Sequence, residues 1–434
     1  MKHLLSALLL ILSAALSAAF IEIRPVEEKI WKAGEEVGFT VKVFDKEKKL
    51  LKEGSCILHV TNSNGRELRK PFKVDLASAN PLRFSAKLPV PGFLMVRSRR
   101  YISADGKEHH WENPAAAAPP VCGVPVEPEK IRTGLPAPAD FDNFWRSAVS
   151  EFKNAAVKVV PEKDVRLKGF KVSRITVVFP DGTGAIDGYL SVPVKAGKYP
   201  VIFSVPGAGE GSVSPTPSYS TGKPAIYVCM NVHKFPTAAF SAEQKKRFAR
   251  YDKSFPDKKT YIHSQAHDRE KYIFRQVWPA LSRAADHVTA AVPEYDGRHL
   301  VFVGSSQGGA TALALSYLNK NAFCAVANVP GFCDHSGWKA GRSSGGPNLH
   351  NVWRGKADAA SLYFDCAYFA SSIRIPVLIS AGFADTTCVP SSIYAAFNNL
   401  KGRKYMFPML HSGHIARKDF AAEARKFLIR ELGL

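Results

Sequence analysis

In residues 20–122, short runs of alternating apolar and polar residues are separated by turn-forming residues. Residues 38–45 (GFTVKVFD) and 55–62 (SCILHVTN) alternate with the period of two that a half-buried strand requires. The sequence Asn62-Ser63-Asn64-Gly65 then favours a turn. Comparable runs follow at residues 72–76, 82–88 and 93–102. Short strands at this spacing predict a small all-β module of the immunoglobulin-like sandwich type.

The pattern changes at residues 113–130, a stretch rich in proline and alanine that favours an extended connector between two domains. Residues 140–156 then show the apolar spacing of an amphipathic helix. Because aspartate often caps helix N-termini, we expect Asp140 to cap this helix. The connector therefore marks the start of a second, different domain.

From residue 172 onward, apolar runs of strand length alternate with segments of helical period. The predicted strands are a hairpin of 173–179 and 185–193, followed by 199–205, 225–232, 300–303, 322–330, 375–382 and 404–410. Long helices are expected at 269–290, after residue 308 and at the C-terminus, whereas residues 231–270 are polar and show no clear pattern. This order predicts an α/β fold over residues 123–434, with a mostly parallel sheet and helices on both faces.

The first 19 residues carry a pattern of their own, in which Met1-Lys2-His3 precedes the apolar run LLSALLLILSAALSAA. A basic start, a short apolar core and small residues at Ser17 and Ala19 are typical of a cleavable signal peptide. The run is short for a membrane-spanning helix. We therefore expect an exported protein, periplasmic or extracellular, without stable membrane insertion.

Composition and charge narrow the possible classes of protein. The 434 residues suffice for two domains with full cores, and 46% hydrophobic and 22% charged residues are ordinary globular values. The net charge is 59 − 38 = +21, but lysine and arginine are spread along the chain, so we expect no nucleic-acid partner. An acidic polysaccharide or envelope is compatible with this charge. The seven cysteines lack CxxC spacing, which argues against a zinc site and predicts mostly buried thiols.

Candidate chemistry begins at residues 300–314 (LVFVGSSQGGATALA), where a strand, a G-x-S-x-G motif and a helix follow one another. This order is that of a nucleophile elbow, a turn so tight that its flanking positions must be glycine. The glycine spacing selects Ser306 as the nucleophile rather than Ser305. The same motif recurs around Ser343, but in a polar run with no strand before it and no helix after it. We interpret that second match as a loop.

A serine nucleophile needs a base, normally a histidine that a carboxylate orients. Asp385 follows the predicted strand 375–382, and active-site residues of parallel sheets collect at the carboxyl ends of strands. Near the C-terminus, His414 follows a glycine and precedes the last helix, so we favour it as the base over His411, which we assign to the pocket. For the other histidines in polar loops we expect solvated or hydrogen-bonded side chains: His233, His263, His267 and His335.

An oxyanion hole needs backbone N–H groups aimed at the developing negative charge. The N–H of Gln307, directly after the nucleophile, is one candidate. We expect the second in residues 206–211 (PGAGEG), whose small residues let the backbone approach a substrate, and we choose Ala208 with Gly209 as the alternative. A phosphate-binding loop is the other interpretation, but the Walker lysine–serine pair and the G-x-G-x-x-G spacing are missing.

Four segments resemble the acetyl xylan esterase / cephalosporin C deacetylase family (carbohydrate esterase family 7), which has the α/β-hydrolase fold: LPAPADFDNFWRSAV, GSSQGGATAL, YFDCAYFASSIRIPVLISAGFADTTCVPSSIYAAFNNL and SGH. The resemblance covers roughly residues 125 to 434, and S-Q-G-G and D-x-x-C-x-P-S are its most specific pieces. It implies the same site residues: nucleophile Ser306, acid Asp385, base His414, and oxyanion donors at Gln307 and in the Gly207-Ala208 loop.

The sequence also departs from the family pattern. Asn231-Val232-His233-Lys234-Phe235-Pro236 stand where the family has an R-G-Q motif, which is tied to active-site support and assembly. Ile415 replaces the glutamate that often follows the catalytic histidine, and the N-terminal β module is an addition. The chain thus resembles a divergent member, for which an oligomer is possible but unsupported.

The sequence therefore predicts a secreted serine esterase that removes acetyl groups from acetylated xylan or xylo-oligosaccharides through an acetyl-enzyme. Neither a metal nor an organic cofactor is required. The alternatives are another carboxylesterase or a peptidase on the same fold, or an inactive polysaccharide-binding relic. An intact set of Ser306, Asp385 and His414 argues against the relic, and the small sandwich argues mildly against a peptidase.

Overall fold

The computed structural model describes residues 19–111, 120–210, 213–237, 241–415 and 417–434. Of the expected signal peptide, all but Ala19 lies outside the described residues. Contacts divide the chain into two compact units. The first contains the residues up to Ile131 with the short segments Gly382–Thr386 and Met409–His414, and the second contains the remainder. Every helix among the described residues is too short or too polar to cross a bilayer.

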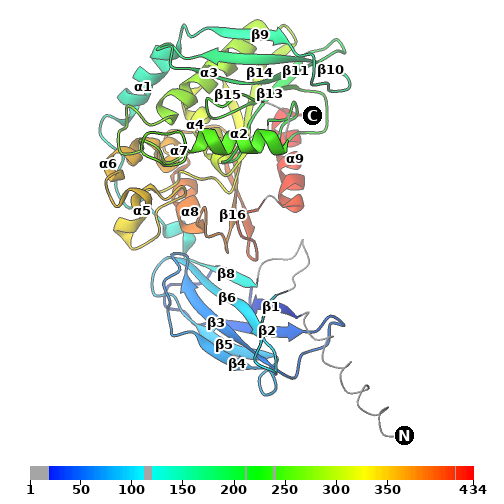
Figure 1. Cartoon of the computed structure of the whole chain (residues 1–434), viewed down its shortest axis with the longest axis vertical. Helices are drawn as coiled ribbons and strands as arrows, with labels where there is room; N and C mark the ends of the chain where they lie inside the picture. Colours follow the sequence, from blue (N-terminus) through cyan, green and yellow to red (C-terminus); the bar gives the residue numbers. More distant parts are fainter. Residues whose placement is uncertain (1–18, 112–119, 211–212, 238–240, 416) are drawn as a thin grey trace. The chain divides into compact units, whose positions relative to one another are not determined.

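The first unit contains two antiparallel sheets of short strands (Figure 1). The strands are β1 (Phe20–Pro25), β2 (Val37–Phe44), β3 (Ser55–Asn62), β4 (Phe72–Asp75), β5 (Leu82–Ala86), β6 (Gly92–Ile102), β7 (Glu108–His110) and β8 (Val121–Val126). One sheet has the order β1-β2-β5, and the other has the order β4-β3-β6-β7 with β8 paired to β6. Inward-facing residues of both sheets, such as Phe39 and Val60, share one buried core. The alternating runs in the sequence predicted β2 to β6, whereas β1 and β7 were not predicted and β8 lies in the expected connector.

The second unit is built on a nine-stranded sheet with the order β17-β16-β15-β14-β12-β13-β11-β10-β9. Its strands are β9 (Val157–Pro161), β10 (Phe170–Val178), β11 (Ala185–Pro193), β12 (Tyr199–Val205), β13 (Ile226–Met230), β14 (Tyr295–Ser305), β15 (Ala322–Asn328), β16 (Val377–Gly382) and β17 (Lys404–Met409). The pairs from β13 through β12, β14 and β15 to β16 are parallel, and β9, β10 and β11 join the sheet in antiparallel fashion. This mostly parallel sheet confirms the predicted fold class.

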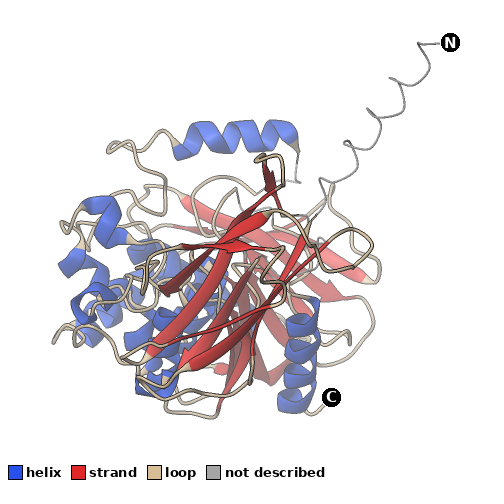
Figure 2. Ribbon diagram, turned by 90° about the horizontal axis from the view of Figure 1, so that it is seen from below, coloured by secondary structure: helices blue, strands red, loops and turns tan. Residues whose placement is uncertain are grey.

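Helices cover both faces of this sheet (Figure 2). They are α1 (Phe141–Phe152), α2 (Ala242–Asp252), α3 (Phe274–Ala291), α4 (Gln307–Leu318), α5 (Leu349–Trp353), α6 (Asp358–Ser361), α7 (Cys366–Ala370), α8 (Pro390–Asn399) and α9 (Lys418–Leu432). Helices α3 and α4 pack on strands β14 and β15 on one side. On the other side, Phe420, Phe427 and Leu428 of α9 share a core with Val301 and Val326 of the sheet. Where both faces are buried, as at residues 300–304 of β14 and along β12 and β13, the central strands are mostly apolar, as their sequences indicated.

Two local expectations are corrected by the structure. The side chain of Asp140 forms no cap hydrogen bond with α1. It instead accepts hydrogen bonds from Tyr363 Oη at 2.5 Å and from Arg269 at 2.9 Å, so charged and polar partners distant in sequence outcompete the cap. Helix α3 begins at Phe274, later than the expected start at residue 269.

Candidate active site

The turn between β14 and α4 holds Ser306 in a backbone conformation that is rare for a residue with a side chain. Ser306 has φ 57° and ψ −120°, a strained region that costs on the order of 1–3 kcal/mol. Two backbone hydrogen bonds hold Ser306 in this conformation: the Ser306 N–H donates to Asn328 O at 2.9 Å, and Ser306 O accepts from Gly331 N at 3.0 Å. This is the sharp strand-to-helix turn that a nucleophile elbow requires.

The two glycines of the elbow motif are explained by close backbone contacts. A Cβ atom on Gly304 would lie 2.4 Å from Gly308 C, and one on Gly308 would lie 2.2 Å from Val205 O at the end of β12. Neither position can therefore carry a side chain without moving the backbone. The expectation that tight packing requires both glycines is confirmed.

The hydroxyl group of Ser305 is committed to a buried network beneath the elbow. It lies 2.7 Å from Tyr219 Oη and accepts a hydrogen bond from Asn328 Nδ2 at 3.1 Å. Ser380 Oγ of β16 in turn donates to Asn328 Oδ1 at 2.5 Å. This network links three neighbouring strands and gives Ser305 a structural role. The second motif match, around Ser343, lies outside any helix or strand, as expected.

The structure brings Asp385 and His414 together. Asp385 follows strand β16, and His414 lies between strand β17 and helix α9. Nδ1 of His414 is 2.7 Å from Oδ2 of Asp385, whose side chain is fully buried, whereas the His414 side chain is 27% exposed. With Nδ1 hydrogen-bonded to the carboxylate, the proton sits on Nδ1 and Nε2 is left as the acceptor. The pair thus has the geometry of a general base and its orienting acid.

The glycine-rich loop after β12 lies beside the elbow. A Cβ atom on Gly207 would be 3.8 Å from Cβ of Ser306. The backbone N–H groups of Ala208 and Gln307 have no hydrogen-bond partner among the described residues, so both are available as donors. The N–H of Gly209, in contrast, already donates to Tyr261 Oη at 3.2 Å. Of the two alternatives in this loop, Ala208 is therefore the one with the unoccupied donor.

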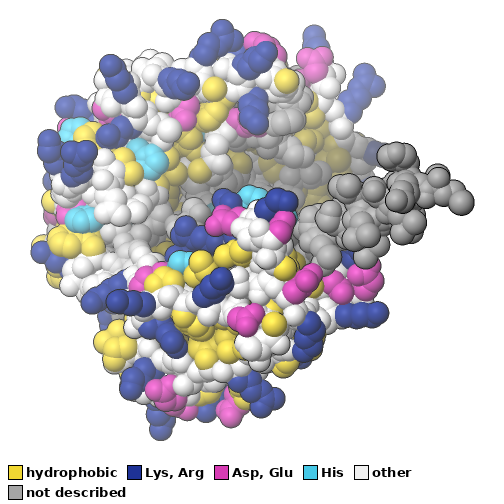
Figure 3. Space-filling view, turned by 60° about the horizontal axis from the view of Figure 1, so that its bottom comes forward, with side chains coloured by type: hydrophobic (Ala, Val, Ile, Leu, Met, Phe, Trp, Pro, Cys, Tyr) yellow, Lys and Arg dark blue, Asp and Glu magenta, His cyan; other side chains and the backbone are white. Residues whose placement is uncertain are grey.

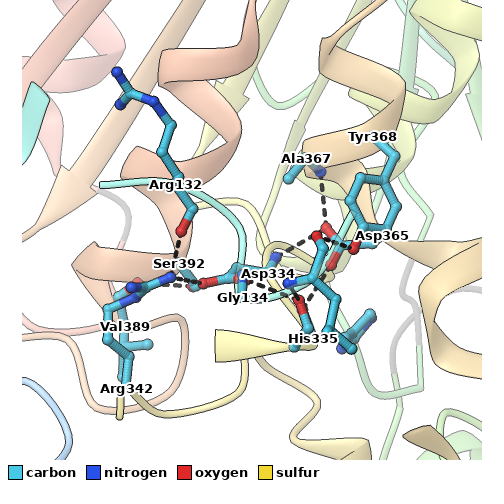
Figure 4. A network of polar contacts seen from close by, with 12 residues as sticks. Arg132, Gly134, Asp334, His335, Arg342, Asp365, Ala367, Tyr368, Val389 and Ser392 are labelled. Atoms are coloured by element: carbon cyan, nitrogen blue, oxygen red, sulfur yellow. Dashed lines mark hydrogen bonds and ion pairs between the residues drawn. The ribbon is translucent and has the colours of Figure 1, made fainter. Parts of the chain in front are cut away.

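The segment after β15 is held by a buried network of polar contacts that sequence analysis missed (Figure 4). The Asp365 carboxylate accepts the N–H groups of Asp334, His335 and Ala367 at 2.7–2.8 Å. Burial, with the charge of Asp334, nevertheless raises the pKa of Asp365 to about 8. Asp334 in turn forms an ion pair of 2.7 Å with Arg342. The Gly331 N–H, three residues before Asp334, donates to Ser306 O, so the same segment contacts the elbow. Sequence analysis missed this network because hydrogen bonds between a side chain and the backbone of a distant residue leave no periodic pattern in the sequence.

The histidines outside the Asp385 pair show one incorrect expectation. His335 is fully buried, and neither ring nitrogen has a hydrogen-bond partner among the described residues, although we expected a solvated or hydrogen-bonded ring. Burial lowers the pKa of His335 to about 3. The other three meet the expectation in different ways: His233 and His263 are hydrogen-bonded to backbone oxygens, and His267 is exposed to solvent beside Trp353.

The burial of the cysteines agrees with the expectation from composition. All seven cysteines are buried, and none of them forms a disulfide. In the part of the chain that the structure describes, no group of three or more histidine, cysteine, aspartate or glutamate side chains is arranged to hold a metal ion. On the face shown in Figure 3, lysine and arginine side chains are scattered, with acidic side chains among them.

Comparisons with known proteins agree on one family. The family model described as Acetyl xylan esterase (AXE1) matches residues 127–431. The acetyl esterase Axe7A of Xylanibacter ruminicola is 30% identical over 339 residues, which are 76% of this chain and 73% of that protein.

Two solved structures support the fold. The acetyl xylan esterase from Paenibacillus sp. R4 is 24% identical with a TM-score of 0.58, and covers 70% of this chain and 98% of its own. Acetyl xylan esterase 1 from Thermoanaerobacterium sp. JW/SL YS485 is 18% identical with a TM-score of 0.56 and the same coverages. At these identities the two structures show the fold alone, and the mostly parallel nine-stranded sheet fits an α/β-hydrolase.

Proposed function

The chain belongs to the acetyl xylan esterase family, and on that premise we propose that it removes acetyl groups from acetylated xylan or xylo-oligosaccharides by covalent serine catalysis. Family membership makes it a carboxylic ester hydrolase. The observation that carries the proposed mechanism is the 2.7 Å contact between His414 Nδ1 and the buried Asp385 carboxylate. In this proposal Ser306, on its strained turn, is the third member of the triad.

In the first half-reaction, Ser306 Oγ attacks the acetyl carbonyl carbon while His414 Nε2 takes the hydroxyl proton. Asp385 stabilises the imidazolium that forms and holds the ring in the required orientation. The carbonyl oxygen becomes an oxyanion that accepts hydrogen bonds from the N–H groups of Gln307 and Ala208. When the intermediate collapses, His414 returns the proton to the sugar oxygen, and the sugar leaves as an alcohol.

In the second half-reaction, water replaces the sugar. His414 removes a proton from the water as it attacks the acetyl-enzyme, and the same oxyanion donors stabilise the second tetrahedral intermediate. Collapse releases acetate and restores the Ser306 hydroxyl. In each half-reaction one proton is transferred through His414. The reaction therefore needs no reactant other than the ester and water.

The substrate and the location of the enzyme complete the proposal. The family description and the name of the Xylanibacter ruminicola relative both refer to acetyl esters, which supports an acetylated carbohydrate as substrate. The apolar N-terminal run with its small terminal residues supports export to the periplasm or the medium. An exported enzyme would meet polysaccharide fragments outside the cytoplasm.

Acetate release tests this function. A panel of acetylated xylo-oligosaccharides, other acetylated sugars and acetylated peptides would be incubated with the protein, with Ser306→Ala as the blank. We expect acetate from the xylo-oligosaccharides at a rate at least about a thousandfold above the blank. Equal acetate release by both proteins would contradict the mechanism, and preference for a peptide substrate would contradict the substrate class.

A further inference from the structure

The segment 231–270, which has no clear sequence pattern, contacts both backbone segments that carry the proposed oxyanion donors. The contact is made by Tyr261, whose side chain is 2% exposed. Its hydroxyl group lies 3.2 Å from Gly209 N and 2.8 Å from Oε1 of Gln307. One oxygen atom therefore bridges the loop after β12 and the first residue of α4.

The direction of both hydrogen bonds is determined by their partners. The Gly209 N–H can only donate, so the Tyr261 oxygen accepts from it. The single hydroxyl proton is then free to donate to Gln307 Oε1. Burial raises the pKa of Tyr261, so this proton stays in place across the range where esterases work. The bridge thus has a single arrangement of donors and acceptors.

His233 binds the second polar group of Gly209, its carbonyl oxygen. Nε2 of His233 lies 3.1 Å from Gly209 O, so the ring donates an N–H to this carbonyl. Burial lowers the pKa of His233 to about 4, and the ring is neutral near pH 7. Both polar groups of Gly209 are therefore bound by side chains of the 231–270 segment.

Gly209 needs such external support. Its φ is +123°, and a Cβ atom built on it would meet no atom within 4 Å, so no neighbouring group packs on this side of the glycine. Ala208, the residue before it, carries the proposed oxyanion donor. The direction of that N–H consequently depends on hydrogen bonds to the neighbouring peptide group.

Tyr261 is itself held by contacts within the 231–270 segment. Asp252, at the end of α2, accepts the Tyr261 N–H at 2.8 Å. The Tyr261 ring packs edge-on against His233 and Phe248, with centroids 5.0 and 6.0 Å apart. Helix α2 (green in Figure 1) thus anchors the aromatic cluster that presents the hydroxyl group.

We propose that Tyr261, assisted by His233, is a positioning residue that fixes the spacing of the two oxyanion donors, Ala208 and Gln307. The inference rests on the proposed function, because the donors are those of the proposed mechanism. It assigns the 231–270 segment a role in transition-state stabilisation, through hydrogen bonds to Gly209 and Gln307.

Tyr261→Phe tests this role, because it removes one oxygen atom and keeps the ring. Tyr251→Phe is the matched control: it removes the same atom from the same aromatic cluster, but the Tyr251 hydroxyl contacts the Lys234 backbone instead. With p-nitrophenyl acetate we expect Tyr261→Phe to lower kcat about ten- to a hundredfold with KM changed less than about twofold, since an oxyanion donor acts in the transition state. Tyr251→Phe should keep kcat within about threefold of wild type.

A transition-state analogue separates positioning from a general loss of structure. A boronic acid that forms a tetrahedral adduct with the nucleophile should bind Tyr261→Phe more weakly by the same factor by which kcat/KM falls. Unchanged affinity for this compound alongside a reduced kcat would overturn the inference. So would equal kcat for Tyr261→Phe and wild type.

A second pair of variants tests His233. His233→Gln retains an N–H donor at a similar reach, whereas His233→Leu does not, and we expect kcat to be partly preserved only in the glutamine variant. Equal activities of these two variants would contradict the role of His233. If Ser306→Ala retains wild-type turnover, the proposed function fails. If Ser306→Ala is inactive and Tyr261→Phe is fully active, this inference alone fails.

Discussion

The buried Asp385 carboxylate is hydrogen-bonded to His414 Nδ1 at 2.7 Å. We expect both its negative charge and its capacity to accept this hydrogen bond to contribute to catalysis. Asp385→Asn keeps the size but offers an amide that favours the wrong histidine tautomer. We expect kcat to fall about 10³- to 10⁴-fold with little change in KM, measured with p-nitrophenyl acetate. Activity within tenfold of wild type would show that Asp385 is not the orienting acid.

The elbow glycines lead to a prediction on stability. A Cβ atom on Gly308 would lie 2.2 Å from Val205 O, a distance that the backbone must relieve by moving. We expect Gly308→Ala to lower the free energy of unfolding by about 1–3 kcal/mol and to reduce kcat. Gly207→Ala is the comparison for stability, because its Cβ would meet its nearest atom at an ordinary 3.6 Å. Equal melting temperatures for the two variants would contradict this account of the elbow.

At the scale of elements, the segment that follows β15 carries a buried titratable residue, His335. Burial lowers the pKa of His335 to about 3, whereas an unfolded histidine titrates near 6.5. Because the folded pKa is the lower one, stability is complete above about pH 6.5 and decreases as the pH falls toward 3. Acid therefore favours the unfolded state, in which the ring can take up a proton.

His335→Phe removes this linkage. We expect the difference in unfolding free energy between the variant and wild type to move in favour of the variant by on the order of 2–3 kcal/mol between pH 7 and pH 4. Urea unfolding at several pH values measures this shift. The Asp365 carboxylate is present in both proteins, so its own titration cancels in the difference. A difference that stays constant with pH would refute the assignment.

The elements also show what the sequence could predict. Strands such as β2 and β12 were predictable because burial on one or both faces imposes a period of two or a continuous apolar run. Ser306, Asp385 and His414 could be proposed as site residues because they follow strands in a fixed order. The role of the 231–270 segment could not be predicted from the sequence. Tyr261 and His233 act through hydrogen bonds to Gly209, and these bonds connect residues far apart in the sequence. Asp140 was misassigned for the same reason: Tyr363 and Arg269 are remote partners.

At the scale of the whole molecule, the net charge of +21 should affect how substrates are attracted. Long-range attraction between exposed charges is screened over about 8 Å at physiological ionic strength. We therefore expect KM for acetylated xylo-oligosaccharides that carry glucuronic acid to rise several-fold between 20 and about 300 mM NaCl. The neutral counterparts should show a change below about twofold. Equal salt dependence for the two substrates would contradict electrostatic attraction.

Covalent labelling tests whether Ser306 is the nucleophile. The protein would be treated with a fluorophosphonate probe and the modified peptide identified by mass spectrometry, with Ser305→Ala as the matched control. We expect the probe to label Ser306 in wild type and in Ser305→Ala. Ser306→Ala should be labelled at least about a hundredfold more slowly. Labelling of Ser306→Ala at the wild-type rate would contradict this assignment.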